Sequence, residues 1–183
     1  MNGKSVNPSN GAETAGLTGL LRCREEDTGK LRREQELRNG KYLGLERHYD
    51  REGRLQRERH VNERGNSQGR VADFWPNGQL RREEFAENAR TQGPVRSFTE
   101  QGKLERLAFH ADGRERFSVE YNAAGQPTRL TCPAASVLPE DRKLCGFGGA
   151  VDTLLYTSSG AKAAQMRYDN GRLLAATEWD AGG

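Results

Sequence analysis

Residues 74–85 read FWPNGQLRREEF, and variants of this stretch recur along the chain. The stretch has an aromatic residue, a short run that ends in glycine, a leucine, and then mixed arginines and glutamates. The glycine recurs at intervals of 24, 25, 24 and 23 residues, as Gly29, Gly53, Gly78, Gly102 and Gly125. A period of this length indicates stacked supersecondary units.

Other residue types keep fixed positions relative to this glycine. An aromatic residue precedes it by four positions in four units, as Tyr49, Phe74, Phe98 and Tyr121. A leucine follows it by two positions, as Leu31, Leu55, Leu80 and Leu104. An arginine follows it by four positions in all five units, and these residues form the arginine column: Arg33, Arg57, Arg82, Arg106 and Arg129.

Each unit reads as a β-hairpin, with two extended halves joined by a short loop that ends in glycine. A type I turn followed by a left-handed residue has this form, and glycine takes the left-handed position at little steric cost. The apolar residues lack the spacing of an amphipathic helix. The sequence therefore predicts an all-β chain of stacked β-hairpin repeats that forms one long twisted antiparallel sheet.

The repeat also divides the chain. Residues 1–16 are small and polar, which predicts a flexible N-terminal segment. Residues 17–131 hold the repeats of about 24 residues, 132–150 match nothing in the repeat and are expected to be an irregular insert, and 151–183 are expected to form C-terminal hairpin strands.

Composition limits the classes of function. Only 33% of residues are hydrophobic and 30% are charged, which favours a thin, solvated sheet over a thick core. The net charge of +3 comes from interleaved signs, so no nucleic-acid partner is expected. No apolar stretch has the roughly 18 residues of a transmembrane span. The first residues lack the apolar core of a signal peptide, so a signal segment is expected to be absent from this chain.

The chain shows no motif that predicts catalysis. It has none of the common zinc, nucleophile-elbow or phosphate-loop patterns, and GFGG at 146–149 reads as a turn. His48, His60 and His110 fall at unrelated positions of the repeat and have no ligand spacing. We expect no enzyme activity, no metal and no cofactor.

The cysteines leave two interpretations open. Cys132 and Cys145 bracket CPAASVLPEDRKLC, a loop that a disulfide could close, and Cys23 stands apart. A disulfide would indicate an oxidising compartment, whereas three reduced thiols would fit the cytosol.

Two features are candidates for binding a partner. Trp75 follows the aromatic column residue Phe74, so strand alternation turns it to the opposite face, either packed or exposed as an anchor. The arginine column lies on one face, either balanced by acidic neighbours such as Glu46, Asp73, Glu84 and Glu120, or open as a basic stripe for an acidic partner. Arginine and tryptophan are enriched at interface hot spots, so the predicted partner-binding residues are Trp75, Arg57, Arg82 and Arg106.

The repeat resembles MORN-type repeats, particularly the degenerate form in the bacterial YwqK-like antitoxin family. Units of that family look like NGKxxGxxxxYxxNGxLxxE, which appears here as NGKYLGLERHYDREGRLQRE at 39–58. The resemblance covers residues 17–131, and YTSSG and RYDNGRLLAATEW continue it near the end. The family pattern is broken where Glu25 replaces the aromatic residue and Arg116 replaces a glycine.

The resemblance implies an immunity protein, or antitoxin, that binds a cognate secreted bacterial toxin and occludes its active site. With an oxidised cysteine pair, the expected compartment is the periplasm and the expected toxin acts there, for example as a phospholipase delivered by type VI secretion. The cytoplasm is the alternative compartment. The alternative function is a scaffold or a module that associates peripherally with anionic lipid surfaces.

Overall fold

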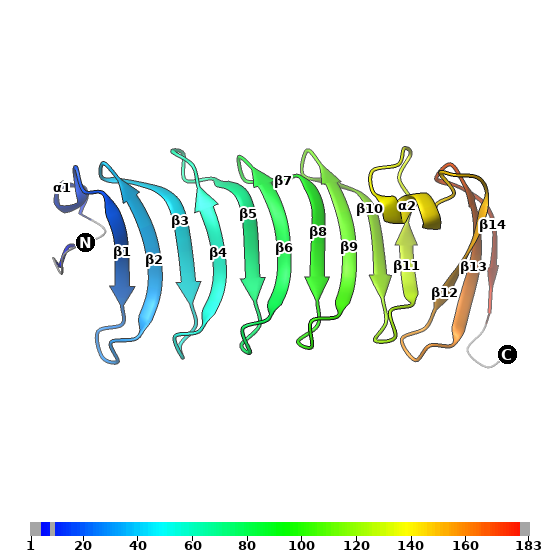
Figure 1. Cartoon of the computed structure of the whole chain (residues 1–183), viewed down its shortest axis with the longest axis horizontal. Coiled ribbons are helices and arrows are strands. Elements are labelled where there is room, and N and C mark those ends of the chain that lie inside the picture. The colour runs from blue at the N-terminus through cyan, green and yellow to red at the C-terminus, as the bar shows by residue number, and fades with distance from the viewer. Residues whose placement is uncertain (1–4, 8–9, 180–183) are drawn as a thin grey trace. The chain divides into compact units, whose positions relative to one another are not determined.

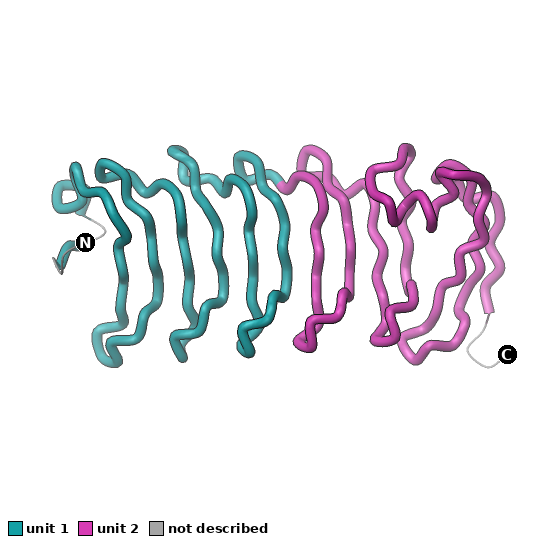
Figure 2. The backbone as a smooth tube through the Cα atoms, in the orientation of Figure 1, with its two compact units in different colours: residues 1–90 teal, residues 91–183 magenta. Residues whose placement is uncertain are grey.

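The computed structural model describes residues 5–7 and 10–179. The chain is 55% strand and 6% helix, with a long antiparallel sheet of 11 strands that is not closed. This confirms the predicted all-β fold of stacked hairpins. The chain divides into two compact units, residues 1–90 and 91–183 (Figure 2).

The first unit holds the short helix α1 (Gly11–Thr14) and consecutive antiparallel strands, each paired with the next along the chain (Figure 1). The strands are β1 (Gly19–Arg24), β2 (Leu31–Arg38), β3 (Lys41–Tyr49), β4 (Leu55–Val61), β5 (Ser67–Phe74) and β6 (Leu80–Glu87). The two-residue strand β7 (Arg90–Thr91) follows them.

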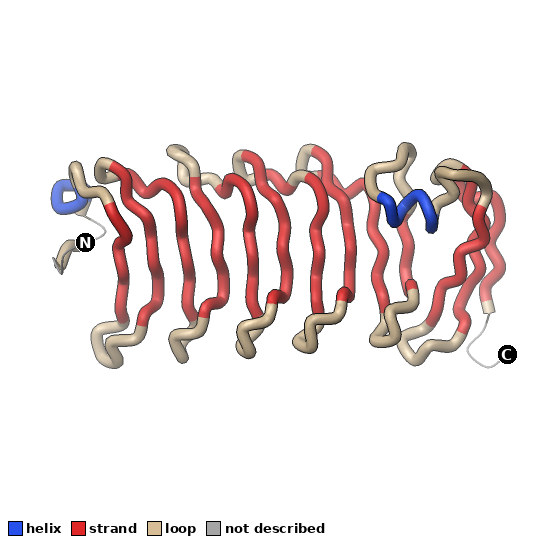
Figure 3. The backbone as a smooth tube through the Cα atoms, viewed as in Figure 1, coloured by secondary structure: helices blue, strands red, loops and turns tan. Residues whose placement is uncertain are grey.

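The second unit continues the same pattern and then departs from it. Its strands β8 (Gly93–Phe98), β9 (Leu104–Ala111), β10 (Arg114–Tyr121) and β11 (Pro127–Thr131) pair in chain order. The helix α2 (Pro139–Leu144) comes next, followed by a separate three-stranded sheet of β12 (Val151–Tyr156), β13 (Lys162–Asp169) and β14 (Arg172–Glu178) (Figure 3).

The repeat glycines close the loops as the sequence predicts. Their φ angles lie between +67° and +84°, the left-handed region that glycine adopts with little strain. Beside each loop the register shifts by one residue and brings the aromatic column opposite the leucine column. The resulting cross-strand pairs are Tyr49 with Leu55, Phe74 with Leu80, and Phe98 with Leu104.

Part of the N-terminal segment is packed inside the first unit. Residues 1–4 and 8–9 of the segment predicted to be flexible lie outside the described residues. Downstream, Asn10 caps α1, and Thr14 is buried. The backbone N–H of Gly40 donates to the carbonyl of Leu17, and a Cβ on Gly40 would meet the Thr14 carbonyl oxygen at 2.8 Å. Glycine is therefore required in this turn.

The core differs between the units. In the first unit the buried residues include the polar side chains of Glu34, Gln35 and Glu46 beside apolar ones such as Leu37 and Val71. In the second unit an apolar cluster forms around Leu107, Phe117, Val119 and Cys145, with Leu138 and Leu144 from the α2 region packed against it. Helix α2 therefore covers one face of β9–β11 and adds a second layer there.

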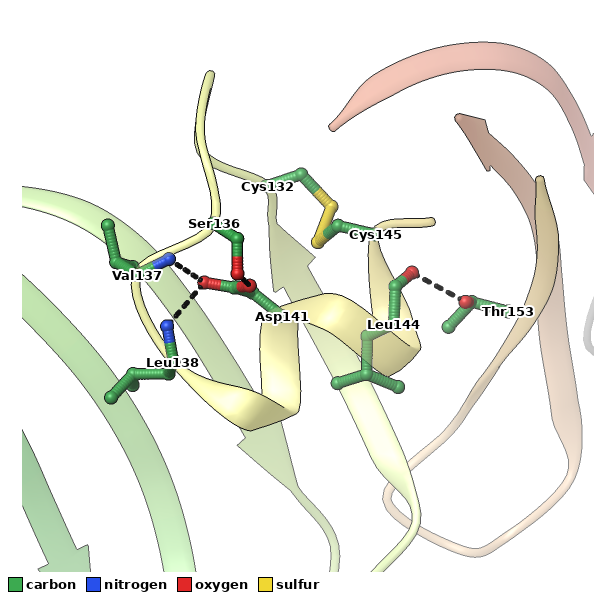
Figure 4. The surroundings of a disulfide bond; sticks show 8 residues. All are labelled: Cys132, Ser136, Val137, Leu138, Asp141, Leu144, Cys145 and Thr153. Carbon is green, nitrogen blue, oxygen red and sulfur yellow. Dashed lines mark hydrogen bonds between the residues drawn. A yellow bond between two sulfur atoms is a disulfide. The ribbon is translucent and has the colours of Figure 1, made fainter. Parts of the chain in front are cut away.

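The segment 132–150, expected to be irregular, is organised around α2 and a disulfide (Figure 4). Cys132 is joined to Cys145, with their Cα atoms 5.7 Å apart, and Cys23 is free. The fully buried carboxylate of Asp141 accepts hydrogen bonds from the Ser136 hydroxyl and from the backbone N–H groups of Val137 and Leu138, at 2.6 to 2.8 Å. These bonds fix the chain that enters α2. Residues 180–183 of the predicted C-terminal strands lie outside the described residues.

Candidate functional site

The loops that end in the repeat glycines share a local hydrogen-bond pattern at their first residue. In most of them a side-chain oxygen at this position accepts backbone N–H groups two or four residues ahead. Such bonds satisfy loop donors that the hairpin leaves unpaired. The residues that do this are Asp50, Thr99 and Asn122, and Thr157 does the same in the loop that ends at Gly160 in the separate sheet.

Trp75 occupies this position in the loop of residues 75–79. An indole has no acceptor atom, so it cannot make these bonds. The backbone of the loop still closes, because Gly78 N–H donates to the Trp75 carbonyl and Trp75 N–H donates to the Gln79 carbonyl, both at 2.8 Å. The side chain of Asn77 accepts from Gln79 N–H at 2.9 Å. These backbone bonds of the loop do not use the indole of Trp75.

The direction of Trp75 does not follow from strand alternation, because β5 ends at Phe74 and Trp75 belongs to the loop. Its half-buried ring faces the guanidinium of Arg81, whose Cζ lies 5.6 Å from the ring centroid. Arg81 also lies 4.0 Å from the carboxylate of Asp73. The loop and the sheet surface are joined through this arginine.

A hollow of about 350 Å³ opens beside Arg81 on the arginine face, which we define as the face of β2–β6 that carries Arg33, Arg57 and Arg82. It is lined by His48, Gln56, Arg57, Arg59, Asp73 and Arg81. Three guanidinium groups thus line it together with one carboxylate. The combination of a stacked tryptophan and a cationic hollow is suited to an acidic side chain carried on another protein. We refer to Trp75 and these lining residues as the Trp75 site.

A buried carboxylate anchors one side of the site. Glu46 is 2% exposed and pairs with Arg59, with Arg33 at 2.6 Å and with His48 at 3.1 Å. Burial raises the pKa of Glu46, but the hydrogen bond from Arg59 and the charges of Arg59, Arg33 and His48 outweigh it and hold the pKa below its ordinary value. Glu46 therefore stays ionised and holds the arginines in place.

Every member of the arginine column has a carboxylate within ion-pair distance. In the first unit the pairs are Arg33–Glu46 at 2.6 Å, Arg57–Asp73 at 3.4 Å and Arg82–Glu84 at 2.7 Å. In the second unit Arg106 pairs with Glu115 and Glu120, and Arg129 pairs with Glu120. The arginine column is therefore balanced by acidic neighbours and is not an open basic stripe. Arg106 belongs to the second unit, so the Trp75 site gathers only Trp75 and Arg57 among the four predicted residues.

The opposite face of the first unit carries a feature that the repeat columns did not reveal. Six side chains of alternating charge, one from each strand β1–β6, form a continuous ion-pair ladder: Arg22, Glu34, Arg47, Glu58, Arg70 and Glu83. The successive N–O distances are 2.9, 3.4, 2.7, 4.0 and 3.3 Å. The ladder gives each of these six charges a neighbour of opposite sign on the adjacent strand.

The sequence does hold a signal for this ladder. The fifth residue after the repeat glycine is Glu34, Glu58 and Glu83 in the first three units, but Leu107 and Leu130 in the last two. Leu107 belongs to the apolar cluster of the second unit, and Leu130 packs against it. The change from glutamate to leucine therefore marks the strands that the insert covers.

No protein-family model and no curated protein matches the chain. Among the described residues, no three histidine, cysteine, aspartate or glutamate side chains are grouped as metal ligands. No helix in the described part of the chain is long and apolar enough to cross a membrane.

Proposed function

We propose that this chain is a non-catalytic immunity protein that binds a secreted bacterial toxin through the Trp75 site and occludes the active site of that toxin. The observation that carries the choice of surface is the tryptophan itself. It takes a loop position that four other loops fill with a bond-forming polar residue, and residues that break a local structural rule concentrate at functional sites.

The chemistry of the site supports an acidic contact on the partner. Trp75 and Arg81 offer a flat, amphipathic surface of the kind found at interface hot spots. The hollow beside them adds Arg57, Arg59 and His48. Arg57 and Arg59 are already paired with Asp73 and Glu46, so a carboxylate of the toxin would accept from other N–H groups of these guanidiniums, each of which carries five donors.

We propose an antitoxin because the repeat resembles the MORN-type repeats of the YwqK-like family. Membership in that family is part of the proposal. The disulfide between Cys132 and Cys145 supports the periplasm as the compartment, since disulfides persist in oxidising environments. The proposed toxin is one that acts in this compartment, such as a phospholipase delivered by type VI secretion.

A peripheral membrane role is the weaker alternative. Binding to anionic lipid requires cationic groups that are available to headgroups. The arginine column is paired with carboxylates throughout, so only weak co-sedimentation with anionic vesicles is expected at physiological salt.

The test is binding of the purified chain to candidate periplasm-acting toxins, together with protection of cells that express them. One toxin should bind, lose its activity on addition of the chain, and become harmless when both are expressed in the periplasm. Arg57→Glu should weaken that binding, whereas Phe85→Asn on the opposite face should not. Protection and binding that survive Arg57→Glu and Trp75→Asn together would reject the Trp75 site. A chain that binds vesicles tightly and no toxin would reject the immunity function.

A further inference from the structure

Two arginines of the Trp75 site, Arg57 and Arg81, share one carboxylate without bonding closely to it. Arg57 Nη1 lies 3.4 Å from Oδ1 of Asp73, and Arg81 Nη2 lies 4.0 Å from Oδ2. Charge-assisted hydrogen bonds between such groups are normally about 2.7–2.9 Å long. Because each guanidinium carries five N–H donors, Asp73 engages only a small part of what these two arginines offer.

The remaining donors of both arginines can be reached from the hollow. Arg57 and Arg81 line it, and their side chains are 42% and 49% exposed. Arg82, the next member of the arginine column, differs from them. Its Nη2 donates a 2.7 Å hydrogen bond to Glu84, and it does not line the hollow.

The hollow also has an excess of positive charge, because Arg59 and Arg81 add to the arginine column. Four guanidinium groups face two carboxylates. The groups are Arg33, Arg57, Arg59 and Arg81, against Glu46 and Asp73. Two positive charges therefore remain, and the neighbouring pair of Arg82 and Glu84 adds none. A single carboxylate would neutralise half of this excess, whereas a dianion would neutralise all of it.

We propose that the hollow binds a phosphate dianion, as inorganic phosphate or as the phosphate group of a small soluble monoester. The oxygen atoms of the phosphate would accept hydrogen bonds from Arg57 and Arg81, since the planar guanidinium fork matches phosphate geometry. The site needs no toxin. A toxin carboxylate at the Trp75 site would use the same donors and compete with the phosphate.

The first test uses the fluorescence of Trp75. The chain has two tryptophans, so Trp179→Phe leaves Trp75 as the only one. Titration with inorganic phosphate above about pH 7, where it is mostly a dianion, should change this fluorescence to saturation at constant ionic strength. The reason is that Cζ of Arg81, which would bind the anion, lies 5.6 Å from the centroid of the Trp75 ring. Acetate should need about tenfold higher concentrations or more, because it carries one charge.

The second test measures affinity without the indole, by equilibrium dialysis with labelled phosphate. Arg57→Gln and Arg81→Gln should each weaken binding about tenfold or more, because each removes charge-assisted hydrogen bonds. Arg82→Gln is the matched control, since it removes the same charge outside the hollow and should change the affinity less than about threefold. The three side chains are 41–49% exposed, so melting curves should show that every variant is folded.

A phospholipid headgroup carries the same chemistry, and a third measurement separates the two sources. Glycerol phosphate should bind as inorganic phosphate does, and vesicles containing phosphatidic acid should bind no more tightly. Binding to these vesicles alone, if lost in Arg57→Gln, would overturn the soluble ligand in favour of a headgroup.

The absence of saturable phosphate binding would overturn the site itself. An equal loss of affinity in Arg57→Gln and Arg82→Gln would do the same, because binding would then depend on net charge and not on the hollow. The toxin assays of the proposed function contain no phosphate, so either proposal can fail without deciding the other.

Discussion

The phenol of Tyr49 donates a 2.8 Å hydrogen bond to Oε2 of Glu34, the same carboxylate that Arg22 and Arg47 hold in the ion-pair ladder. Tyr49 belongs to the aromatic column of the repeat, and Glu34 belongs to the column that becomes leucine in the second unit. This hydrogen bond therefore joins the aromatic column beside the loops to the ion-pair ladder.

The coupling predicts an alkaline transition. Burial and the hydrogen bond to Glu34 raise the pKa of Tyr49 to about 12, whereas a tyrosine in the unfolded chain titrates near 10. Because the folded pKa is the higher one, this contribution to stability is complete below about pH 10 and is lost as the pH rises toward about 12. Spectrophotometric titration of the native chain minus that of Tyr49→Phe should show one phenol with the raised pKa. An ordinary pKa in this difference would contradict the prediction.

The lowered pKa of Glu46 predicts how the free energy of unfolding changes at acid pH. Its pKa is lowered in the folded chain, so its contribution is present above the ordinary pKa near 4.5 and is lost as the pH falls through the lower folded value. Urea unfolding of the native chain should therefore show stability that decreases below about pH 4.5.

Glu46→Gln provides the matched variant for the acid profile. It should cost about 1–3 kcal/mol at pH 7, because Arg33 and Arg59 then lose their charged partner while keeping some access to water. It should also flatten the acid limb of the profile. An acid limb as steep as that of the native chain would assign the effect to other carboxylates.

Much of the fold could be predicted from one column of the sequence. The repeat glycines locate the loops, and the positions around them correctly place the aromatic and leucine pairs. Helix α2 was not predictable in this way, because six residues starting with proline carry too few turns for a helical period, and its support comes from Asp141, the disulfide and the apolar cluster. The separate sheet of β12–β14 was missed because its hairpins resemble the earlier ones, and the pairing partner of a strand is not written in the repeat.

The candidate site was only partly accessible from sequence for a similar reason. Trp75 is visible as a departure from the repeat, but its contact with Arg81 depends on the register shift beside the loop. The ion pairs of the arginine column depend on which carboxylates lie across each strand pair. The composition shows that acidic and basic residues are nearly equal in number. Only the register of the strands shows which arginine pairs with which carboxylate.

The disulfide predicts a local loss of stability on reduction. Cys132 and Cys145 are 13 residues apart, and closing a loop of this length contributes roughly 3 kcal/mol in the chain-entropy model. Cys132→Ser with Cys145→Ser should lower the melting temperature and expose the apolar cluster under α2 to a hydrophobic dye. Cys23→Ser is the control and should have little effect. Mass mapping of periplasmic material without reductant should find Cys132 joined to Cys145, and free thiols at both positions would remove the support for this compartment.

The Trp75 site predicts a separation of binding from folding. Trp75→Asn places at this loop position the residue type that Asn122 uses, whose side chain accepts from the backbone N–H groups of Ala124 and Gln126. The new side chain should offset part of the loss of the tryptophan's contacts, of which the one with Arg81 is worth about 0.5–1 kcal/mol. The free energy of unfolding should therefore stay within about 1 kcal/mol of the native value.

Affinity for the toxin should respond differently. Loss of a central anchor costs about 2 kcal/mol or more, a decrease of roughly 30-fold in affinity. Phe85→Asn is the matched control, because Phe85 is 55% exposed on the face that carries the ion-pair ladder and should not contribute to binding. If Trp75→Asn instead unfolds the first unit, tryptophan serves packing. If it binds the toxin as tightly as the native chain while Phe85→Asn does not, the partner lies on the ladder face, where the alternating charges of β1–β6 would meet a partner of mixed charge.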